Sequence, residues 1–415
     1  MSINTNTMST NTMSINTNTM STNDTESRST NNIDDQSTLS TNIDPQALLA
    51  QIQGSSATVD DVISLQQDGQ FDALIADCDE ALSSLLTIRD FIRFSVTQLR
   101  NYDVVVAQGT NDVFAEAAAI VLHSLSLDWS AEEQILDCRL TPSEKGEVLS
   151  LLQSRIIYRK PLSYLVNLAY FCDLPFYVDE RVLIPRSPIA ELIRQQFYPY
   201  FETNEAAQPL APESTTDIPL FYLHGLEDKQ LYQPERILDL CTGSGCIAIA
   251  LASRFKDALV DAADIDREAL EVAAVNVEHH GMEHQLNLIE SDLFSKIPAE
   301  NQYELIVTNP PYVDAAAMAE LPPEFIHEPE HALAAGQDGL DLVHRILYEA
   351  PDYLTTEGLL VCEVGDSEWA LRQAYPEIQF DWLSFVHGGH GVFAIDRGAL
   401  MNYRELFAEQ VAQLR

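Results

Sequence analysis

Hydrophobic residues in the second half of the chain form short runs separated by segments with helical spacing. Runs of this kind, bounded by turn residues, predict buried strands. Seven such strands are predicted: Arg236–Leu240, Ala258–Asp264, Leu286–Glu290, Leu305–Thr308, Gly358–Glu363, Phe380–Phe385 and Gly391–Ile395. Strands that alternate with helices favour a mostly parallel, doubly wound α/β sheet. Because the last two strands are close in sequence, we expect an antiparallel pair at that edge.

The first half of the chain has a different pattern, in which apolar residues recur every three or four positions. This spacing is typical of amphipathic helices. It predicts helices over 116–125 and 147–158, the latter after a start signal at Thr141-Pro142. We therefore predict a small helical domain at 58–170 and an α/β domain at 235–415.

Three further segments complete the predicted organisation. Residues 1–57 begin with two copies of a twelve-residue unit rich in Ser, Thr and Asn, which predicts a disordered low-complexity tail. Residues 171–200 are predicted to form a hairpin and a linker helix, with two short strands in 174–185 around Asp179-Glu180 and the helix at 187–198. Residues 201–234 are predicted to be a polar connection.

The amino-acid composition limits which binding partners and which cellular compartment are expected. The chain has 64 acidic and 23 basic side chains, a formal net charge of −41. Such a chain repels nucleic acid phosphates and attracts basic proteins, so free DNA is not expected as a partner, although solubility alone also explains the charge. Six scattered cysteines without CxxC spacing favour a reducing compartment. With no apolar run of about 18 residues and no secretory signal, we expect a cytoplasmic protein without membrane contact.

A glycine-containing turn follows the first predicted strand of the α/β domain. Glycines at 243 and 245 remove Cβ atoms where a ligand approaches the backbone, and the following helix offers free N–H groups. A short Gly-x-Gly turn is a weak signal alone, but its place between a strand and a helix suits ligand binding. The candidate cofactor-binding residues here are Asp239, Thr242, Gly243, Ser244 and Gly245.

Acidic residues end the next two strands. Asp264 lies 21 residues after Gly243 and can accept hydrogen bonds from both ribose hydroxyls. Asp292, followed by Leu293, can bind an adenine amino group. All of these positions lie at carboxyl ends of strands, where open α/β sheets bind ligands. NAD would favour a third glycine where Ala248 stands, whereas Asp239 can face a methionine ammonium, which favours S-adenosyl-L-methionine.

The sequence Asn309-Pro310-Pro311-Tyr312 directly follows the fourth strand. Its prolines fix the backbone, so that the Asn309 side-chain oxygen and the Pro310 carbonyl can bind both hydrogens of an –NH2 group while Tyr312 lies against its flat face. An amide nitrogen is a poor nucleophile, and alignment of the reactants can supply roughly 7–11 kcal/mol. These residues therefore predict methyl transfer to a planar amide or amine nitrogen, as catalytic and substrate-binding groups.

One zinc-protease pattern is discounted. Residues His327 to His331 formally match His-Glu-x-x-His, but Pro329 would break the continuous helix that this metal site needs. We expect no metal here. Glu328 is instead expected to shape the pocket near Asn309.

The chain resembles the protein-(glutamine-N5) methyltransferases over about residues 80–400. The resemblance is carried by the Asn-Pro-Pro-Tyr motif, the turn at 237–246 and the preceding helical region. The resemblance implies a Rossmann-like class I methyltransferase fold and S-adenosyl-L-methionine as cofactor. It implies that the residues singled out above line the cofactor or hold a glutamine, and that Pro185 and Arg186 border the substrate pocket. It also implies that the helical domain recognises the substrate.

This family has branches that differ in their substrate protein, and the residues after Pro185-Arg186 indicate which branch this chain resembles. Ser187-Pro188 resembles the branch that modifies a glutamine of large-subunit ribosomal protein L-three, whereas the release-factor branch usually has Pro-Glu-Thr or Pro-Asp-Thr there. Basic ribosomal protein L-three is thus the expected protein substrate, and its charge complements this acidic chain. A release-factor substrate, an adenine-N6 nucleic acid methyltransferase and a non-enzymatic assembly factor remain the alternatives.

Overall fold

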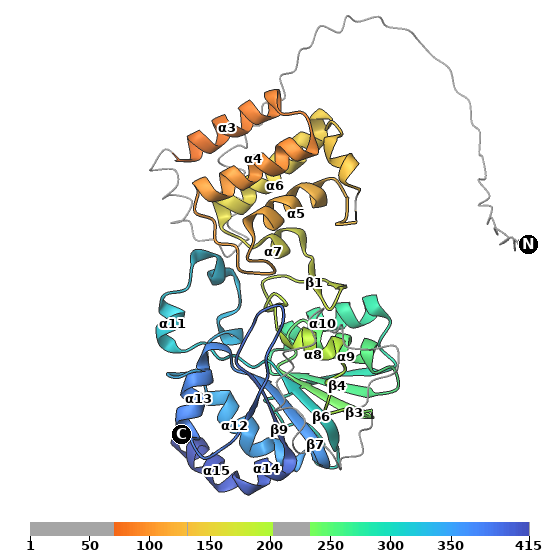
Figure 1. Cartoon of the computed structure of the whole chain (residues 1–415), viewed down its shortest axis with the longest axis vertical. Coiled ribbons are helices and arrows are strands. Elements are labelled where there is room, and N and C mark those ends of the chain that lie inside the picture. Colours follow the sequence, from red (N-terminus) through yellow and green to blue (C-terminus); the bar gives the residue numbers. More distant parts are fainter. Residues whose placement is uncertain (1–69, 131, 202–232, 415) are drawn as a thin grey trace, which may run out of the picture. The chain divides into compact units, whose positions relative to one another are not determined.

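Within the part of the chain that the structure describes, seven strands form one sheet in the order β5-β4-β3-β6-β7-β9-β8 (Figure 1). The computed structural model describes residues 70–130, 132–201 and 233–414. The strands are β3 Arg236–Leu240, β4 Leu259–Asp264, β5 Leu286–Glu290, β6 Tyr303–Thr308, β7 Leu354–Glu363, β8 Asp381–Trp382 and β9 Val392–Asp396. Each overlaps one of the seven predicted strands.

The pairing of these strands sets the position of the ligand site. β3 runs parallel to β4 and β6, which places Leu240 beside Ala263 and Thr308. The direction of winding reverses between β3 and β6, and such a switch point is where open α/β sheets bind ligands. β9 is antiparallel to both β7 and β8, so the predicted mixed sheet with an antiparallel edge is confirmed.

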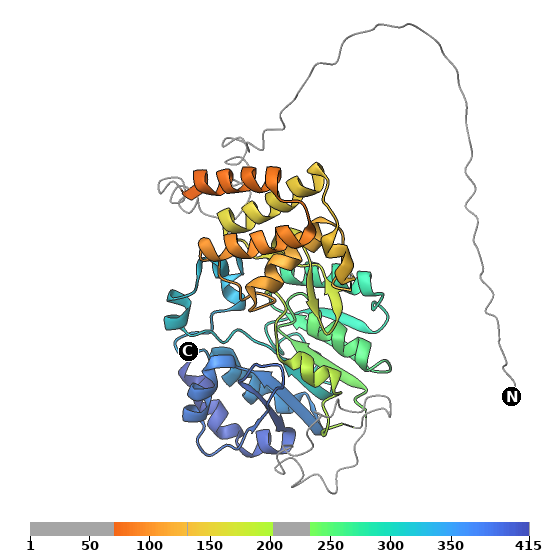
Figure 2. The same ribbon diagram turned by 45° about the horizontal axis from the view of Figure 1, so that its top comes forward.

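Helices cover both faces of the sheet (Figure 2). One face packs against α8 Ile189–Arg194, α9 Cys246–Arg254 and α10 Arg267–His280. The other packs against α12 Asp341–Glu349, α13 Glu368–Ala374, α14 Arg397–Asn402 and α15 Arg404–Gln413. The shorter helices of this region are α11 Ala315–Ala319 and the 3-10 turns η3 Pro323–His327, η4 Glu330–Ala332, η5 Ala350–Asp352 and η6 Gly365–Ser367.

The helical region has a hydrophobic core of its own, centred on residues such as Phe91, Ile120 and Leu152. Its elements are α3 Gln70–Ser84, α4 Ile88–Asn101, α5 Val113–Ser124, η1 Glu133–Asp137, α6 Pro142–Tyr158 and α7 Leu162–Val166. The start signal before α6 is confirmed, because Thr141 accepts a hydrogen bond from the Glu144 N–H and the Glu144 carboxylate accepts one from the Thr141 N–H.

The predicted hairpin at 174–185 is wrong in its position. The strands are β1 Ala169–Phe171 and β2 Leu174–Phe176, which pair across a turn at Cys172 and Asp173. No strand is found between Tyr177 and Pro185, and the helix predicted at 187–198 is reduced to α8. The backbone of 177–185 is instead bound by side chains, because Tyr164 donates to the Val182 carbonyl and Asn167 to the Val178 carbonyl.

A buried carboxylate joins the helical region to the segment that follows β6. Glu324 is completely buried in η3 and accepts a hydrogen bond from the Val105 N–H at 3.0 Å. It also pairs with the Arg159 guanidinium at 3.3 Å. Three residues later, a ring nitrogen of His327 lies 2.8 Å from the Tyr158 carbonyl oxygen. The two regions are therefore joined by desolvated polar contacts as well as by the chain.

Two predicted segments lie outside the described residues, namely the tail at 1–57 and nearly all of the connection at 201–234. Within the described ranges, no helix combines the length and apolar character that a membrane span requires.

Candidate functional site

A cavity lies at the carboxyl ends of β3, β4 and β6. It is lined by the loop before α8, the glycine turn after β3, the end of β4 and the motif after β6, with further contributions from α9, α10, η4 and α12. The predicted site residues that line it are Pro185, Arg186, Thr242, Gly243, Ser244, Asp264, Asn309 and Pro311. The fold thus brings together candidates for cofactor and substrate that are more than a hundred residues apart in sequence.

Asp239 lies beneath the glycine turn and is completely buried. Its Oδ2 accepts hydrogen bonds from the Thr242 hydroxyl at 2.6 Å and from the Ala248 N–H at 3.1 Å. Its Oδ1 is buried without a partner among the described residues. Burial raises the pKa of Asp239 to about 7, although the Thr242 hydrogen bond opposes that rise. An unpaired carboxylate oxygen in such a place fits a cationic group of a ligand.

Asp264 holds the glycine turn from the end of β4. Its Oδ2 accepts a hydrogen bond from the Gly243 N–H at 2.8 Å, and its Oδ1 accepts one from the Asp266 N–H at 2.9 Å. Burial raises the pKa of Asp264 as well. Gly243 and Gly245 both have positive φ, which only glycine adopts without strain. The carboxylate is therefore fixed at the cavity wall, with lone pairs left for ligand hydroxyls.

Asn309 begins the motif after β6 and presents an unusual oxygen. Its Oδ1 is shielded from water, yet no described residue donates a hydrogen bond to it. An amide oxygen in this state costs free energy unless a ligand completes it. Pro310 and Pro311, both buried, fix the backbone that carries it. This oxygen can accept a hydrogen bond from an –NH2 group in the cavity.

Tyr312 is held by hydrogen bonds at both its hydroxyl and its carbonyl. Its hydroxyl donates to Glu363 Oε1 at 2.9 Å, and its carbonyl accepts a hydrogen bond from the Ser367 hydroxyl at 2.8 Å. The buried Glu363 carboxylate also accepts a hydrogen bond from Ser187, at 2.5 Å. Burial raises the pKa values of Tyr312 and Glu363. Tyr312 is therefore a neutral donor with a fixed ring position.

Glycines leave the space that this arrangement needs. A Cβ atom at Gly365, which has φ of +47°, would lie 2.6 Å from the Tyr312 ring. A Cβ atom at Gly339, where φ is +77°, would lie 2.2 Å from the Tyr312 carbonyl oxygen. Both contacts are far inside van der Waals distance. Any larger residue at either position would displace the motif from the end of β6.

Arg186 forms one wall of the cavity and is paired with a completely buried Glu328. Two nitrogens of the guanidinium contact the two Glu328 oxygens at 2.5 and 2.9 Å, and the guanidinium lies over the Phe325 ring. Glu328 does not itself line the cavity, but it holds Arg186, which does; its expected role in shaping the pocket near Asn309 stays a prediction. The structure also breaks the helix at Pro329, between η3 and η4, so His327 and His331 do not share a continuous helix.

Other predicted site residues do not line the cavity. Asp239 is buried beneath the glycine turn, Gly245 packs against Ala273 of α10, and Pro310 and Tyr312 flank Pro311, which does line the cavity. Asp292 pairs with Arg345 of α12 at 2.9 Å, and the side chain of Leu293 is buried in the core on that face. The adenine-binding role of Asp292 and Leu293 stays a prediction.

Sequence reasoning missed several contributors to the site. Ile265, which is 64% exposed directly after Asp264, lines the cavity and offers it an apolar surface. His331 also lines the cavity and pairs with Asp266. Glu363 could have been suspected only from its position at the end of β7, beside the motif. Asp261, three residues before Asp264 on β4, is buried and bonded to Tyr303 and Arg236.

Comparisons with known proteins agree with this geometry. Residues 221–340 match the family model of the methyltransferase small domain. The ribosomal protein uL3 glutamine methyltransferase of Francisella tularensis subsp. tularensis is 38% identical over 79% of this chain and 96% of its own length. The protein of the same name from Neisseria meningitidis serogroup B is 39% identical, over 78% and 97%. The chain therefore belongs to the family of ribosomal protein uL3 glutamine methyltransferases.

Proposed function

We propose that this protein transfers a methyl group from S-adenosyl-L-methionine to the N5 side-chain nitrogen of a glutamine in ribosomal protein uL3. The observation that carries the proposal is the unpaired Asn309 Oδ1 in the same cavity as Asp264 and the glycine turn. One wall thus suits a nucleotide-like cofactor and the other suits an –NH2 group. The closely related uL3 methyltransferases supply the substrate name.

The residues present fit the proposed cofactor. The unpaired Asp239 Oδ1 would bind the methionine ammonium, directly or through water, and Asp264 would accept hydrogen bonds from the ribose hydroxyls. Thr242, Gly243 and Ser244 would border its methionine moiety. When bound, the cofactor supplies a methyl group on positively charged sulfur, so the protein needs no metal or covalent nucleophile.

The acceptor glutamine would be held by the motif after β6. Asn309 Oδ1 and the Pro310 carbonyl would accept its two amide hydrogens, and the Tyr312 ring would support its flat face. Acceptors fixed in this way align the nitrogen and stabilise the positive charge that develops on it. The Tyr312–Glu363–Ser187 hydrogen bonds keep these groups in place before the substrate arrives. Pro185 and Arg186 would form the entrance.

A direct test compares three acceptors. Purified protein is incubated with methyl-labelled S-adenosyl-L-methionine and either uL3, a peptide chain release factor or DNA. We expect label on uL3, in a glutamine side chain located by mass spectrometry. Label on the release factor alone would assign the chain to the other branch. Label on DNA alone would overturn the substrate class.

Cofactor binding should depend on pH through Asp239. Because its pKa is raised to about 7, lowering the pH protonates the carboxylate that would bind the ammonium. Affinity is therefore lost as the pH falls through 7. Between pH 7.5 and pH 5.5 we expect the Kd, measured by titration calorimetry, to rise ~25-fold, as follows from a single group with that pKa.

The matched control is Asp239→Asn, which keeps the shape and cannot titrate. It should bind the cofactor weakly at every pH, and its Kd should change little over the same range. Asp264, whose pKa is also raised, is intact in this variant. An equal pH response in Asp239→Asn would assign the titration to Asp264 and remove the role given to Asp239.

A further inference from the structure

A second cavity opens beside the first, on the side of the helical region. It is lined by α5, the segment after it, α7 and β1, through residues that include Gln108, Leu122, Trp129, Ser163 and Tyr170. Pro185 lines this cavity as well as the site described above. The two cavities therefore share a wall, directly beside Arg186.

Gln108 is the chemically distinctive residue of this cavity. Its side chain is only 5% exposed, and neither its amide oxygen nor its amide nitrogen has a hydrogen-bond partner among the described residues. Leaving such groups unpaired in the interior costs free energy, because they lose their hydrogen bonds to water. A ligand that offers both a donor and an acceptor would remove this cost. A polypeptide backbone offers both at every residue except proline.

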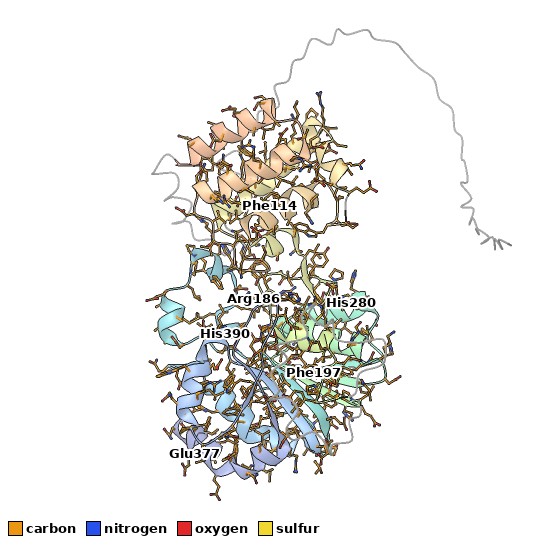
Figure 3. The ribbon with its side chains drawn as sticks, viewed as in Figure 1. Phe114, Arg186, Phe197, His280, Glu377 and His390 are labelled. Carbon is orange, nitrogen blue, oxygen red and sulfur yellow. The ribbon has the colours of Figure 1, made fainter. Side chains whose placement is uncertain are left out.

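Exposed aromatic side chains surround the same cavity. Trp129 is 60% exposed and Tyr170 is 57% exposed, and both contribute to the lining. Phe114, on α5 next to the lining residue Ala115, is 57% exposed (Figure 3). Large aromatic residues at protein interfaces supply much of the binding free energy when a partner covers them. Their grouping here indicates a protein-binding surface.

The acidic residues near this cavity indicate the charge of the polypeptide that would bind there. Residues 110–133, which include α5 and the segment after it, contain five acidic side chains and no lysine or arginine. Among them, Asp112 and Asp128 are exposed, whereas Glu116 is buried and paired with Arg155. This sign repels nucleic acid and attracts a basic chain.

From these four observations we propose that the second cavity binds an extended, basic segment of the substrate protein next to the target glutamine. Gln108 would pair with its backbone, and Trp129 and Tyr170 would cover its side chains. The segment would pass over Pro185, so that the glutamine enters the neighbouring cavity. This inference rests on the proposed function, because it assigns one part of that protein's chain to a defined surface.

The test uses Gln108→Leu and Trp129→Ala in the full-length protein. Gln108→Leu removes the amide and keeps the size, and it should fold with equal or greater stability because an unpaired buried amide is lost. Trp129→Ala changes a side chain that is mostly in solvent. The matched control is Trp369→Ala, because Trp369 is 72% exposed on α13 and does not line the cavity.

We expect the KM for uL3 to rise about tenfold in each of the two cavity variants, the effect of losing roughly 1.4 kcal/mol of binding. The kcat and the Kd for the cofactor should stay at the wild-type values, and Trp369→Ala should behave as wild type. For the wild type, raising the salt concentration should also raise the KM for uL3, because attraction between unlike charges is screened.

Two results would overturn the inference. If the wild type methylates uL3 and both cavity variants keep its KM, the segment does not bind here. If a ribosomal RNA fragment competes with uL3 on the wild type but not on Trp129→Ala, the cavity binds RNA. A wild type that transfers no label to uL3 would instead contradict the proposed function itself, so the two failures can be told apart.

Discussion

Replacing Asn309 by alanine is expected to lower kcat for uL3 methylation by roughly 100- to 1000-fold, the usual effect of removing one preorganised polar group from a site of developing charge. The buried Asn309 Oδ1 has no other partner, so its hydrogen bond would be made only with the substrate amide. A group that acts mainly in the transition state lowers kcat and kcat/KM together. Single-turnover transfer of labelled methyl measures the effect, and calorimetry should give an unchanged Kd for the cofactor.

The control is the same substitution at Asn287. This asparagine is exposed on β5 and donates a hydrogen bond to Asp261, away from the cavity. Asn287→Ala should retain the wild-type kcat. Turnover by Asn309→Ala at a rate close to that of Asn287→Ala would contradict the role given to Asn309, whatever the identity of the acceptor.

A large loss of stability is expected for Glu328→Ala. Glu328 is completely buried and binds the Arg186 guanidinium through both of its oxygens. Removing Glu328 leaves the mostly buried Arg186 charge without a carboxylate partner. In fully buried ion pairs, removing one partner costs about 3–5 kcal/mol. Because the Arg186 side chain is 25% exposed, we expect the free energy of unfolding to fall by about 3 kcal/mol, measured by urea titration.

Two variants separate this loss from the general effect of removing an ion pair. Asp173 is 86% exposed and pairs with Arg194, so Asp173→Ala should cost less than about 1 kcal/mol. The double variant Arg186→Met/Glu328→Leu replaces the pair by apolar groups and should recover most of the stability. It should not recover activity, because Arg186 lines the cavity. Equal losses in Glu328→Ala and Asp173→Ala would contradict the argument.

The sheet could be predicted because each strand is marked by a pattern of neighbouring residues in the sequence. Buried strands such as β3 and β6 are short apolar runs, and the residues that follow a parallel strand necessarily meet at one edge of the sheet. This is why Thr242, Asp264 and Asn309 were found from sequence and line one cavity. The role of each side chain toward a cofactor or a glutamine remains a prediction.

The rest depends on contacts between distant segments. The apolar residues of 177–185 resemble a strand, but their backbone is bound by side chains of Tyr164 and Asn167, which no local pattern reveals. The contacts Arg186–Glu328 and Ser187–Glu363 span 142 and 176 residues. Residue types and spacing cannot specify such pairs before the topology is known.

The buried Glu324 has a consequence for how this chain can be divided. A catalytic fragment that starts after Val166 would lose the Val105 N–H, which donates to that carboxylate, and the guanidinium groups of Arg155 and Arg159, which pair with it. The cut would leave an uncompensated negative charge close to the segment that carries Glu328. The helical region and the α/β region therefore cannot be separated simply because each has its own hydrophobic core. A truncated chain would need Glu324 replaced by an apolar residue before it could serve as a minimal enzyme.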